Sequence, residues 1–150
     1  METLFLEKIQ QKLGEVPGLK YIDEDWGQLD DYSPNFPVQW PCCLIDLTAA
    51  TFSNIGIDKA VKPKNRQEGT AMIAFTFANL KLTNSSFRAP KPQKDNAWSL
   101  YKLTQKAHEA LHGFSPEGSG KLIRTAFRRI KRDDGLQQYQ IIYSLVLHNV

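Results

Sequence analysis

The last thirty residues constrain the fold most, because they have the pattern of one β-hairpin with a defined register. The segment Asp133-Asp134-Gly135 has the chemistry of a three-residue hairpin loop, a type I turn followed by a glycine in the left-handed conformation. With this loop, Arg132 faces Leu136, and the numbers of paired residues sum to 268. Even-numbered residues therefore pair with even-numbered residues along the whole hairpin.

This register separates the side chains of the hairpin by type. One face collects Arg124, Ala126, Arg128, Ile130 and Arg132 opposite Gln138, Gln140, Ile142, Ser144 and His148. The other face collects Ile123, Thr125 and Phe127 opposite Tyr139, Ile141, Tyr143, Leu145 and Leu147. A slip of one residue would mix the two sets. Strands of about eleven residues span about 36 Å, more than twice the radius of gyration of about 15 Å for a chain of this size. The pattern therefore predicts a tip that projects beyond the body of the domain.

The hairpin is strongly basic, since six of the twelve residues from Lys121 to Arg132 are Lys or Arg. Such a stripe attracts nucleic-acid phosphates, but base stacking also needs aromatic rings on the same face. Here the aromatic rings lie on the opposite face, which predicts no sequence-specific nucleic-acid binding. We expect an acidic partner, such as another copy of the chain, to meet five residues of the hairpin: Arg124, Arg128, Arg129, Lys131 and Arg132.

Charge is divided along the chain, although the formal net charge is only +3. Residues 1–60 hold four basic and ten acidic residues, whereas residues 61–150 hold fifteen basic and six acidic residues. The division suits copies that pack head to tail, a basic surface on nucleic acid, or two solvated halves. The acidic counter-surface would be the loop that contains Asp23, Glu24, Asp25, Asp30 and Asp31. Its spacing lacks the alternating ligands and glycine of a calcium loop.

Helical spacing of apolar residues predicts two helices. The first covers residues 2–14, with Phe5, Ile9, Leu13 and Val16 on one face. The second begins at a cap on Asp95 or Asn96 and ends at Gly113, and its apolar stripe consists of Leu100, Leu103, Ala107, Leu111 and Phe114. Both helices are one-sided, so each must pack against something.

Strands are predicted over residues 19–22, 40–47 and 69–82, in addition to the terminal hairpin. Residues 50–68 are polar and lack periodicity, so we expect a mobile loop there, and residues 83–95 form a second loop. The order of elements has no regular βαβ alternation. We therefore predict one α+β domain over residues 1–150, with a mostly antiparallel sheet of about four strands packed with two helices and ending in a long hairpin.

The composition narrows the environment of the chain. Cys42 and Cys43 are the only cysteines and are adjacent, which predicts reduced strand residues in an intracellular protein. The absence of an apolar run of 18 residues predicts no membrane-spanning helix.

The sequence His108-Glu109-Ala110-Leu111-His112 matches the HExxH motif of zinc peptidases, in which two histidines bind zinc and the glutamate activates water. At 100° per residue, the two histidines lie about 100° and about 140° from the apolar stripe, and Glu109 lies nearly opposite it. We therefore expect both histidines on the solvent flank. Four residues downstream could supply a third ligand, but none has a recognisable spacing: Glu117, Asp133, Asp134 and His148. A zinc hydrolase that uses His108 and His112 remains an alternative.

The order and lengths of the parts resemble the tail terminator or tail completion proteins of long-tailed phages. The resemblance runs through PCCLIDL, TAMIAFTFANLKL, NAWSLYKLTQKAHEALHGF and the terminal hairpin, with no diagnostic motif, and the loops 50–68 and 83–95 depart from it. It implies copies that form a ring, typically a hexamer, which caps the tail tube and meets the head connector. It implies no catalytic residues and no cofactor. The location it implies is the host cytoplasm during assembly and then the virion tail.

The sequence is therefore consistent with three hypotheses of different classes. The first is a non-enzymatic structural tail protein of a phage or prophage, whose partners are itself, tail-tube proteins and head-connector proteins. The second is a zinc-dependent hydrolase. The third is a basic nucleic-acid-binding module.

Overall fold

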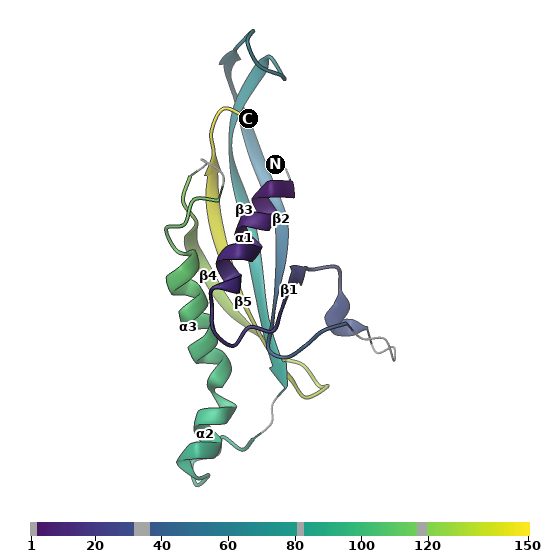
Figure 1. Ribbon diagram of the computed structural model, residues 1–150, viewed down its shortest axis with the longest axis vertical. Helices are drawn as coiled ribbons and strands as arrows, with labels where there is room; N and C mark the ends of the chain where they lie inside the picture. The colour runs from purple at the N-terminus through teal and green to yellow at the C-terminus, as the bar shows by residue number, and fades with distance from the viewer. Residues whose placement is uncertain (1–2, 32–36, 81–82, 117–119) are drawn as a thin grey trace.

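The computed structural model describes residues 3–31, 37–80, 83–116 and 120–150, and it has one sheet with helices packed against it (Figure 1). The sheet has five strands in the order β1-β2-β3-β5-β4. Every neighbouring pair is antiparallel except β1 with β2. The predicted α+β class is confirmed, with five strands where about four were expected.

The strands differ greatly in length. Their bounds are β1 Tyr21–Glu24, β2 Cys42–Ile57, β3 Asn65–Leu80, β4 Ile123–Ile130 and β5 Leu136–Leu147. β1 pairs only with residues 42–45 of β2, whereas β5 pairs with β3 along all twelve of its residues. The end of β2 and β3 near their shared turn therefore extends past the other strands, as Figure 1 shows at the top of the molecule.

The helices follow the apolar stripes of the sequence. Helix α1 (Thr3–Gly14) is confirmed, although the predicted first residue of that helix lies outside the described residues. Helix α3 (Ser99–Leu111) is also confirmed, and Gly113 follows it with a φ of 84°, the left-handed conformation that ends a helix. No helix among the described residues is long and apolar enough to cross a membrane.

The predicted start of the second helix is wrong, because a short helix, α2 (Lys91–Ala97), precedes α3. Asp95 lies inside α2, and the chain breaks at Trp98 without a side-chain cap. The first turn of α2 contains Pro92, which a helix tolerates there because the first N–H groups have no partner inside the helix. Residues 91–95 of the expected loop 83–95 are therefore helical.

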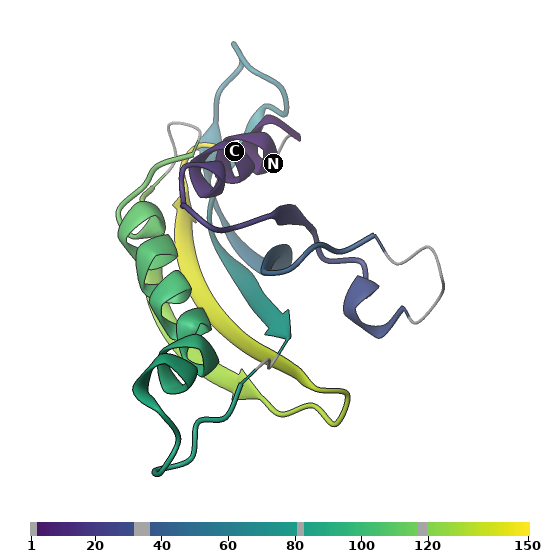
Figure 2. The same ribbon diagram turned by 60° about the horizontal axis from the view of Figure 1, so that its bottom comes forward.

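One apolar core joins α1 and α3 to one face of the sheet (Figure 2). Phe75 and Tyr143 meet edge to face at its centre, with ring centroids 5.4 Å apart. The predicted stripes of both helices contribute Phe5, Ile9, Leu13, Val16, Leu100, Leu103, Ala107 and Leu111. The predicted apolar face of β5 is buried here as well: Tyr139, Ile141, Tyr143, Leu145 and Leu147.

A smaller apolar cluster lies on the other face of the sheet, and the acidic loop packs against the sheet through it. Leu29, in the short 3-10 helix η1 (Gln28–Asp30), and Val38 cover Cys42, Leu44 and Ala78. Gln28 is fully buried, but its amide accepts from the N–H of Trp26 (2.8 Å) and donates to the carbonyl of Glu24 (2.9 Å). These two bonds satisfy the buried amide and fix the turn. The part of the predicted acidic loop over residues 32–36 lies outside the described residues.

The expected mobile loop over residues 50–68 is wrong. β2 continues to Ile57 and β3 begins at Asn65, so most of this segment is a β-hairpin. Two β-bulges explain the error, because the register shifts between Leu47 and Ala49 and again between Asn54 and Gly56. Each bulge adds one residue to the strand and breaks the two-residue alternation that marks a strand in sequence. The predicted strand 69–82 is present, although residues 81–82 lie outside the described residues.

The terminal hairpin confirms the predicted register near its turn and contradicts it further away. Pairs from Ile130–Gln138 to Ala126–Ile142 sum to 268, and Gly135 has a φ of 80°. A bulge at Thr125 then shifts the pairs by one. β4 is an edge strand, so Ile123 and Phe127 are exposed rather than buried in the core as expected. The residues of the Gly-rich connector at 117–119 lie outside the described residues.

Candidate functional site

The end of the β2–β3 hairpin is the most prominent surface feature, and we call residues 52–68 the arm. The last pair between β3 and β5 is Gly69 with Leu147, so beyond Gly69 the strand β3 has only β2 as a paired neighbour. Phe52 lies across from Gly69, where a Cβ would come within 2.7 Å of the Phe52 ring. The glycine therefore lets this ring lie flat over the strand at the base of the arm.

The side chains of the arm combine apolar surface with unpaired positive charge. Ile57 is 70% exposed and Phe52 is 49% exposed, and Ile55 and Val61 are exposed too. The turn orders itself through bonds from Asp58 N–H to the Lys64 carbonyl (2.8 Å) and from Ala60 N–H to the Asp58 carboxylate (2.9 Å). Lys59, Lys62 and Lys64 are exposed there, and no described carboxylate lies within 4 Å of their ammonium groups.

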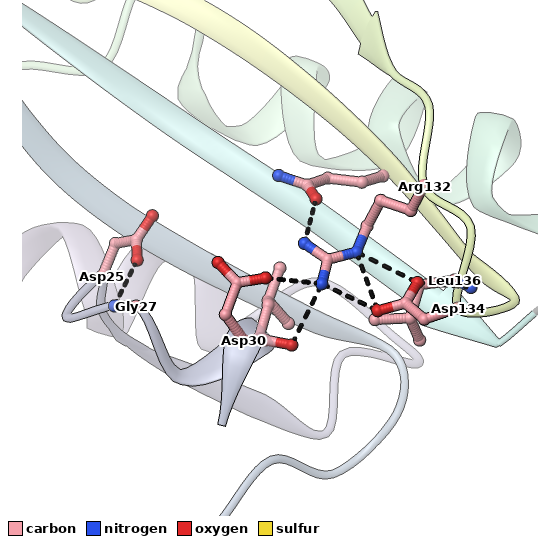
Figure 3. Close-up of polar contacts among 8 residues, drawn as sticks. Asp25, Gly27, Asp30, Arg132, Asp134 and Leu136 are labelled. Atoms are coloured by element: carbon pink, nitrogen blue, oxygen red, sulfur yellow. Dashed lines mark hydrogen bonds and ion pairs between the residues drawn. The ribbon is translucent and has the colours of Figure 1, made fainter. Parts of the chain in front are cut away.

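The terminal hairpin, where the sequence predicted the interface, is held by its own chain (Figure 3). The Arg132 guanidinium lies between two carboxylates, 2.7 Å from Asp30 and 2.8 Å from Asp134. It also donates to the carbonyl of Leu29 and to the amide oxygen of Gln138. The hydrogen bonds that Arg132 donates to Asp134 are the main reason that the pKa of Arg132 rises above its ordinary value. The prediction of a free projecting tip is therefore wrong, because η1 binds the tip and β3 pairs along all of β5.

The other basic residues of the predicted interface remain on the surface. Arg124, Arg128, Arg129 and Lys131 are exposed on β4 and the turn that follows it. Arg128 donates to the amide oxygen of Gln140 at 2.6 Å. Phe127 stacks on Tyr139, with ring centroids 5.6 Å apart, so its ring is engaged on the helix side of the sheet. The role of these four residues in contacts between copies stays a prediction.

The predicted acidic counter-surface is divided by the fold. Asp30 binds Arg132, but no Lys or Arg nitrogen of the described residues lies within 4 Å of Asp23, Glu24 or Asp25. Asp23 and Asp25 accept hydrogen bonds from within the turn. The pKa of Asp46 is raised chiefly by burial, and in addition by repulsion from the nearby carboxylate of Asp25. This surface therefore carries negative charge without an internal cation.

The zinc-type motif lies where α3 meets β5 and β4. His108 Nδ1 is 2.7 Å from the Tyr143 hydroxyl, and His112 Nδ1 accepts from the backbone N–H of Arg124 (3.2 Å). The expectation that both histidines lie on the solvent flank is wrong for His108, which is half-buried against the sheet. Burial raises the pKa of Tyr143 to about 12, so its hydroxyl stays protonated, and it shares a hydrogen bond with His108 Nδ1. Burial, with the nearby Arg124, lowers the pKa of His108.

The described residues offer neither a metal-binding cluster nor an activated cysteine. Among residues 3–31, 37–80, 83–116 and 120–150, no group of three or more His, Cys, Asp or Glu side chains could hold a metal ion. Glu117, one proposed third ligand, lies outside those ranges. Cys42 and Cys43 are buried free thiols, and burial raises the pKa of Cys42 to about 12. A thiol with so high a pKa is a weak nucleophile at neutral pH.

Comparisons with known proteins leave the function open. No family model matches the sequence, and no curated protein gives a significant match. Among solved structures, the fold is similar to a chain in the virion of a native gene transfer agent (GTA) particle. The TM-score is 0.49 and the sequence identity is 8%, over 97% of this chain and 92% of that chain. A likeness at this score carries no argument about function.

The sequence reasoning missed the arm, although a signal for it was present. Ile55 and Ile57 are β-branched residues that favour strands, and they lie in a segment with a strand pattern on either side. An alternation test that allowed one extra residue would have joined these segments into two long strands. The exposed apolar residues of the arm could then have been singled out before the structure was known.

Proposed function

We propose that this chain is a non-enzymatic structural protein of a phage or prophage tail that oligomerises into a ring. In this role the ring caps the tail tube and joins it to the head connector. The observation that carries the proposal is the arm, a two-stranded extension with exposed apolar side chains. Fully burying an Ile or Phe side chain contributes about 1.5–3 kcal/mol, so covering the arm with a partner would stabilise an assembly.

The support lies in the kind of surface rather than in any reactive group. An isolated two-stranded hairpin is marginally stable, so the free end of the arm gains most from a neighbour that packs on it. In a ring the arm of one copy packs on a different surface of the next copy. A contact between two different surfaces is heterologous, and such contacts generate rings when the rotation closes. The resemblance to tail terminator proteins in the order of parts agrees with this.

A direct test measures the oligomeric state by size-exclusion chromatography with light scattering. We expect the wild-type chain to form a closed oligomer, and we expect purified oligomer to bind the ends of tail tubes in electron micrographs. A chain that stays monomeric at high concentration and is not recruited by tube protein would contradict the proposal.

The arm itself can be removed without disturbing the rest of the sheet. Asn54 pairs with Gln67, and their side-chain amides are 2.8 Å apart, so residues 55–66 can be replaced by an Asn-Gly turn. Gln67 keeps its two backbone bonds to Val150 in this variant. We expect the shortened chain to fold and to remain monomeric. As a matched control, Phe87→Ser removes an aromatic ring that is 92% exposed outside the arm, and it should leave the oligomer intact.

A further inference from the structure

We propose that the tip of the arm docks onto the acidic surface of a second copy of this chain. The inference deepens the proposed function and rests on it, because it names the contact that joins neighbouring copies. We call the receiving surface the acidic face. It consists of Asp23 and Asp46 on the side of the sheet that η1 covers, Asp25 close to Asp46, and Trp26, which follows Asp25 in the chain.

The tip carries the charge that the acidic face lacks. Lys59, Lys62 and Lys64 are exposed within one turn of the chain. The nearest acidic residue, Asp58, uses its carboxylate to accept from the N–H of Ala60. Arg66 donates to Asn149 and to the carbonyl of Pro63, so it supports the turn from behind. The three lysines therefore have no ion-pair partner in the described part of their own chain.

The acidic face is the matching surface. Its carboxylates have no Lys or Arg partner within 4 Å among the described residues, in contrast to Asp30, which Arg132 neutralises. Trp26 is 57% exposed beside them, although burial of its ring would be favourable. Tryptophan is the ring that Lys ammonium groups prefer for cation–π contact. The face thus offers both opposite charge and apolar area to a basic, apolar tip.

The contact joins two copies, because the arm points away from the acidic face of its own chain. In Figures 1 and 2 the tip lies at the top of the molecule, beyond both labelled termini, whereas β1 and η1 lie to one side. No hydrogen bond or ion pair connects Lys59, Lys62 or Lys64 to residues 21–31 in the structure. One copy would therefore give its tip and receive a neighbour's tip, which repeats head to tail.

A protein partner fits the tip better than nucleic acid does. Phosphate binding requires only the lysines, and it would leave Ile57 and Val61 in water. A second copy supplies carboxylates for the lysines and an aromatic ring for the apolar side chains. Nucleic acid is therefore an outcome of the test rather than the proposal.

Charge reversal on each surface tests the contact. The tip variant is Lys59→Glu, Lys62→Glu and Lys64→Glu. The face variant is Asp46→Lys, because Asp23 and Asp25 accept hydrogen bonds that hold the turn, whereas Asp46 does not. We expect each variant alone to weaken self-association about tenfold or more in sedimentation velocity at 0.1 M salt, because like charges then face each other. Mixing the two variants should restore assembly, since the reversed tip then meets the reversed face, and the wild-type tip of the face variant meets the wild-type face of the tip variant.

A matched control carries the same change in charge on another surface. Lys91→Glu, Lys102→Glu and Lys106→Glu alter three exposed lysines of α2 and α3. This variant should associate like the wild type. Equal loss in the control, or failure of the mixture to associate when both variants melt like the wild type, would overturn the docking contact.

The remaining outcomes separate this inference from the proposed function. If the wild type forms an oligomer that neither reversal weakens, the docking contact is wrong and the structural role survives. A monomeric wild type overturns both. Anisotropy with a labelled DNA duplex gives the last outcome: if the tip variant loses DNA binding while assembly is unchanged, the tip is a nucleic-acid surface and the inference fails.

Discussion

The two long hairpins of this chain, β2–β3 and β4–β5, differ in whether the rest of the chain holds their turns. The β4–β5 turn holds Arg132, which binds Asp30 and Asp134 and ties the turn to η1. The β2–β3 turn holds three exposed lysines without a described ion-pair partner, and it extends past the rest of the sheet. Both turns are basic, so the number of charges does not decide which hairpin projects. The β4–β5 turn is anchored because η1 brings Asp30 to Arg132, whereas the β2–β3 turn extends because its strands continue past the last pair of β3 with β5.

The largest expected effect is a difference in stability between a substitution in the buried part of the β2–β3 hairpin and one in its arm. Phe75 is fully buried against Tyr143, and Phe75→Ala should lower the free energy of unfolding by about 3–5 kcal/mol because it leaves a cavity. Phe52→Ala removes the same ring where it is half exposed, and it should cost less than about 1 kcal/mol. Urea denaturation at a concentration where both variants are monomeric measures the difference. Similar losses would show that the arm is not separate from the core.

The next effect tests the anchor of the terminal hairpin. The Arg132 side chain is 13% exposed and that of Asp134 is 17% exposed, so Arg132→Met should cost about 1–2 kcal/mol and leave a carboxylate without its cation. Asp30 is 72% exposed, and Asp30→Asn should cost less than about 1 kcal/mol because solvent screens that pair. Arg128→Met is the matched control on the same hairpin and should change stability little. Faster hydrogen exchange at residues 131–136 in Arg132→Met alone would confirm the anchor.

A smaller expected effect is a pH dependence of stability that comes from His108, which contacts Tyr143 of β5. The pKa of His108 lies below its ordinary 6.5 in the folded chain, chiefly through burial, with Arg124 and His112 adding to the decrease and Glu109 opposing it. The unfolded chain therefore binds the proton first as the pH falls, and stability decreases from about pH 6.5 down to the lowered pKa. His108→Gln should flatten this part of the stability profile in thermal melts between pH 7.5 and 5, and an unchanged slope would contradict the assignment.

The smallest effect belongs to the tip of the arm. Lys62→Ala should change the free energy of unfolding by less than about 0.5 kcal/mol, because its ammonium group has no partner in the described residues. A loss comparable to that of Arg132→Met would mean that the tip is anchored after all. The two turns would then no longer differ.

Most of the fold could be predicted because its signals are local. The stripe of Phe5, Ile9 and Leu13 places α1 on the core, and the parity around Gly135 places β5 with Tyr139 and Tyr143 inward. Three errors have physical causes. The bulges in β2 concealed its extension to Ile57, the edge position of β4 exposed Phe127, and α2 begins before the predicted cap at Asp95 or Asn96.

The candidate site was harder to predict, because it depends on which charges meet. The sequence pattern placed Arg132 in a basic interface and Asp30 in its acidic counter-surface, which would bring them together from different copies. They lie 102 residues apart in one chain, and only the cover that η1 places over Leu44 and Ala78 brings them within 2.7 Å. The same fold leaves Lys59, Lys62 and Lys64 without such a neighbour.

The sequence by itself determined the α+β class, the faces of α1 and α3 and the register near the last turn, because periodicity and turn chemistry act over a few residues. Only the tertiary structure decided which hairpin is anchored and which is free. That choice depends on contacts between residues far apart in the chain, and such contacts form only once the sheet and its two apolar clusters have placed the turns in space.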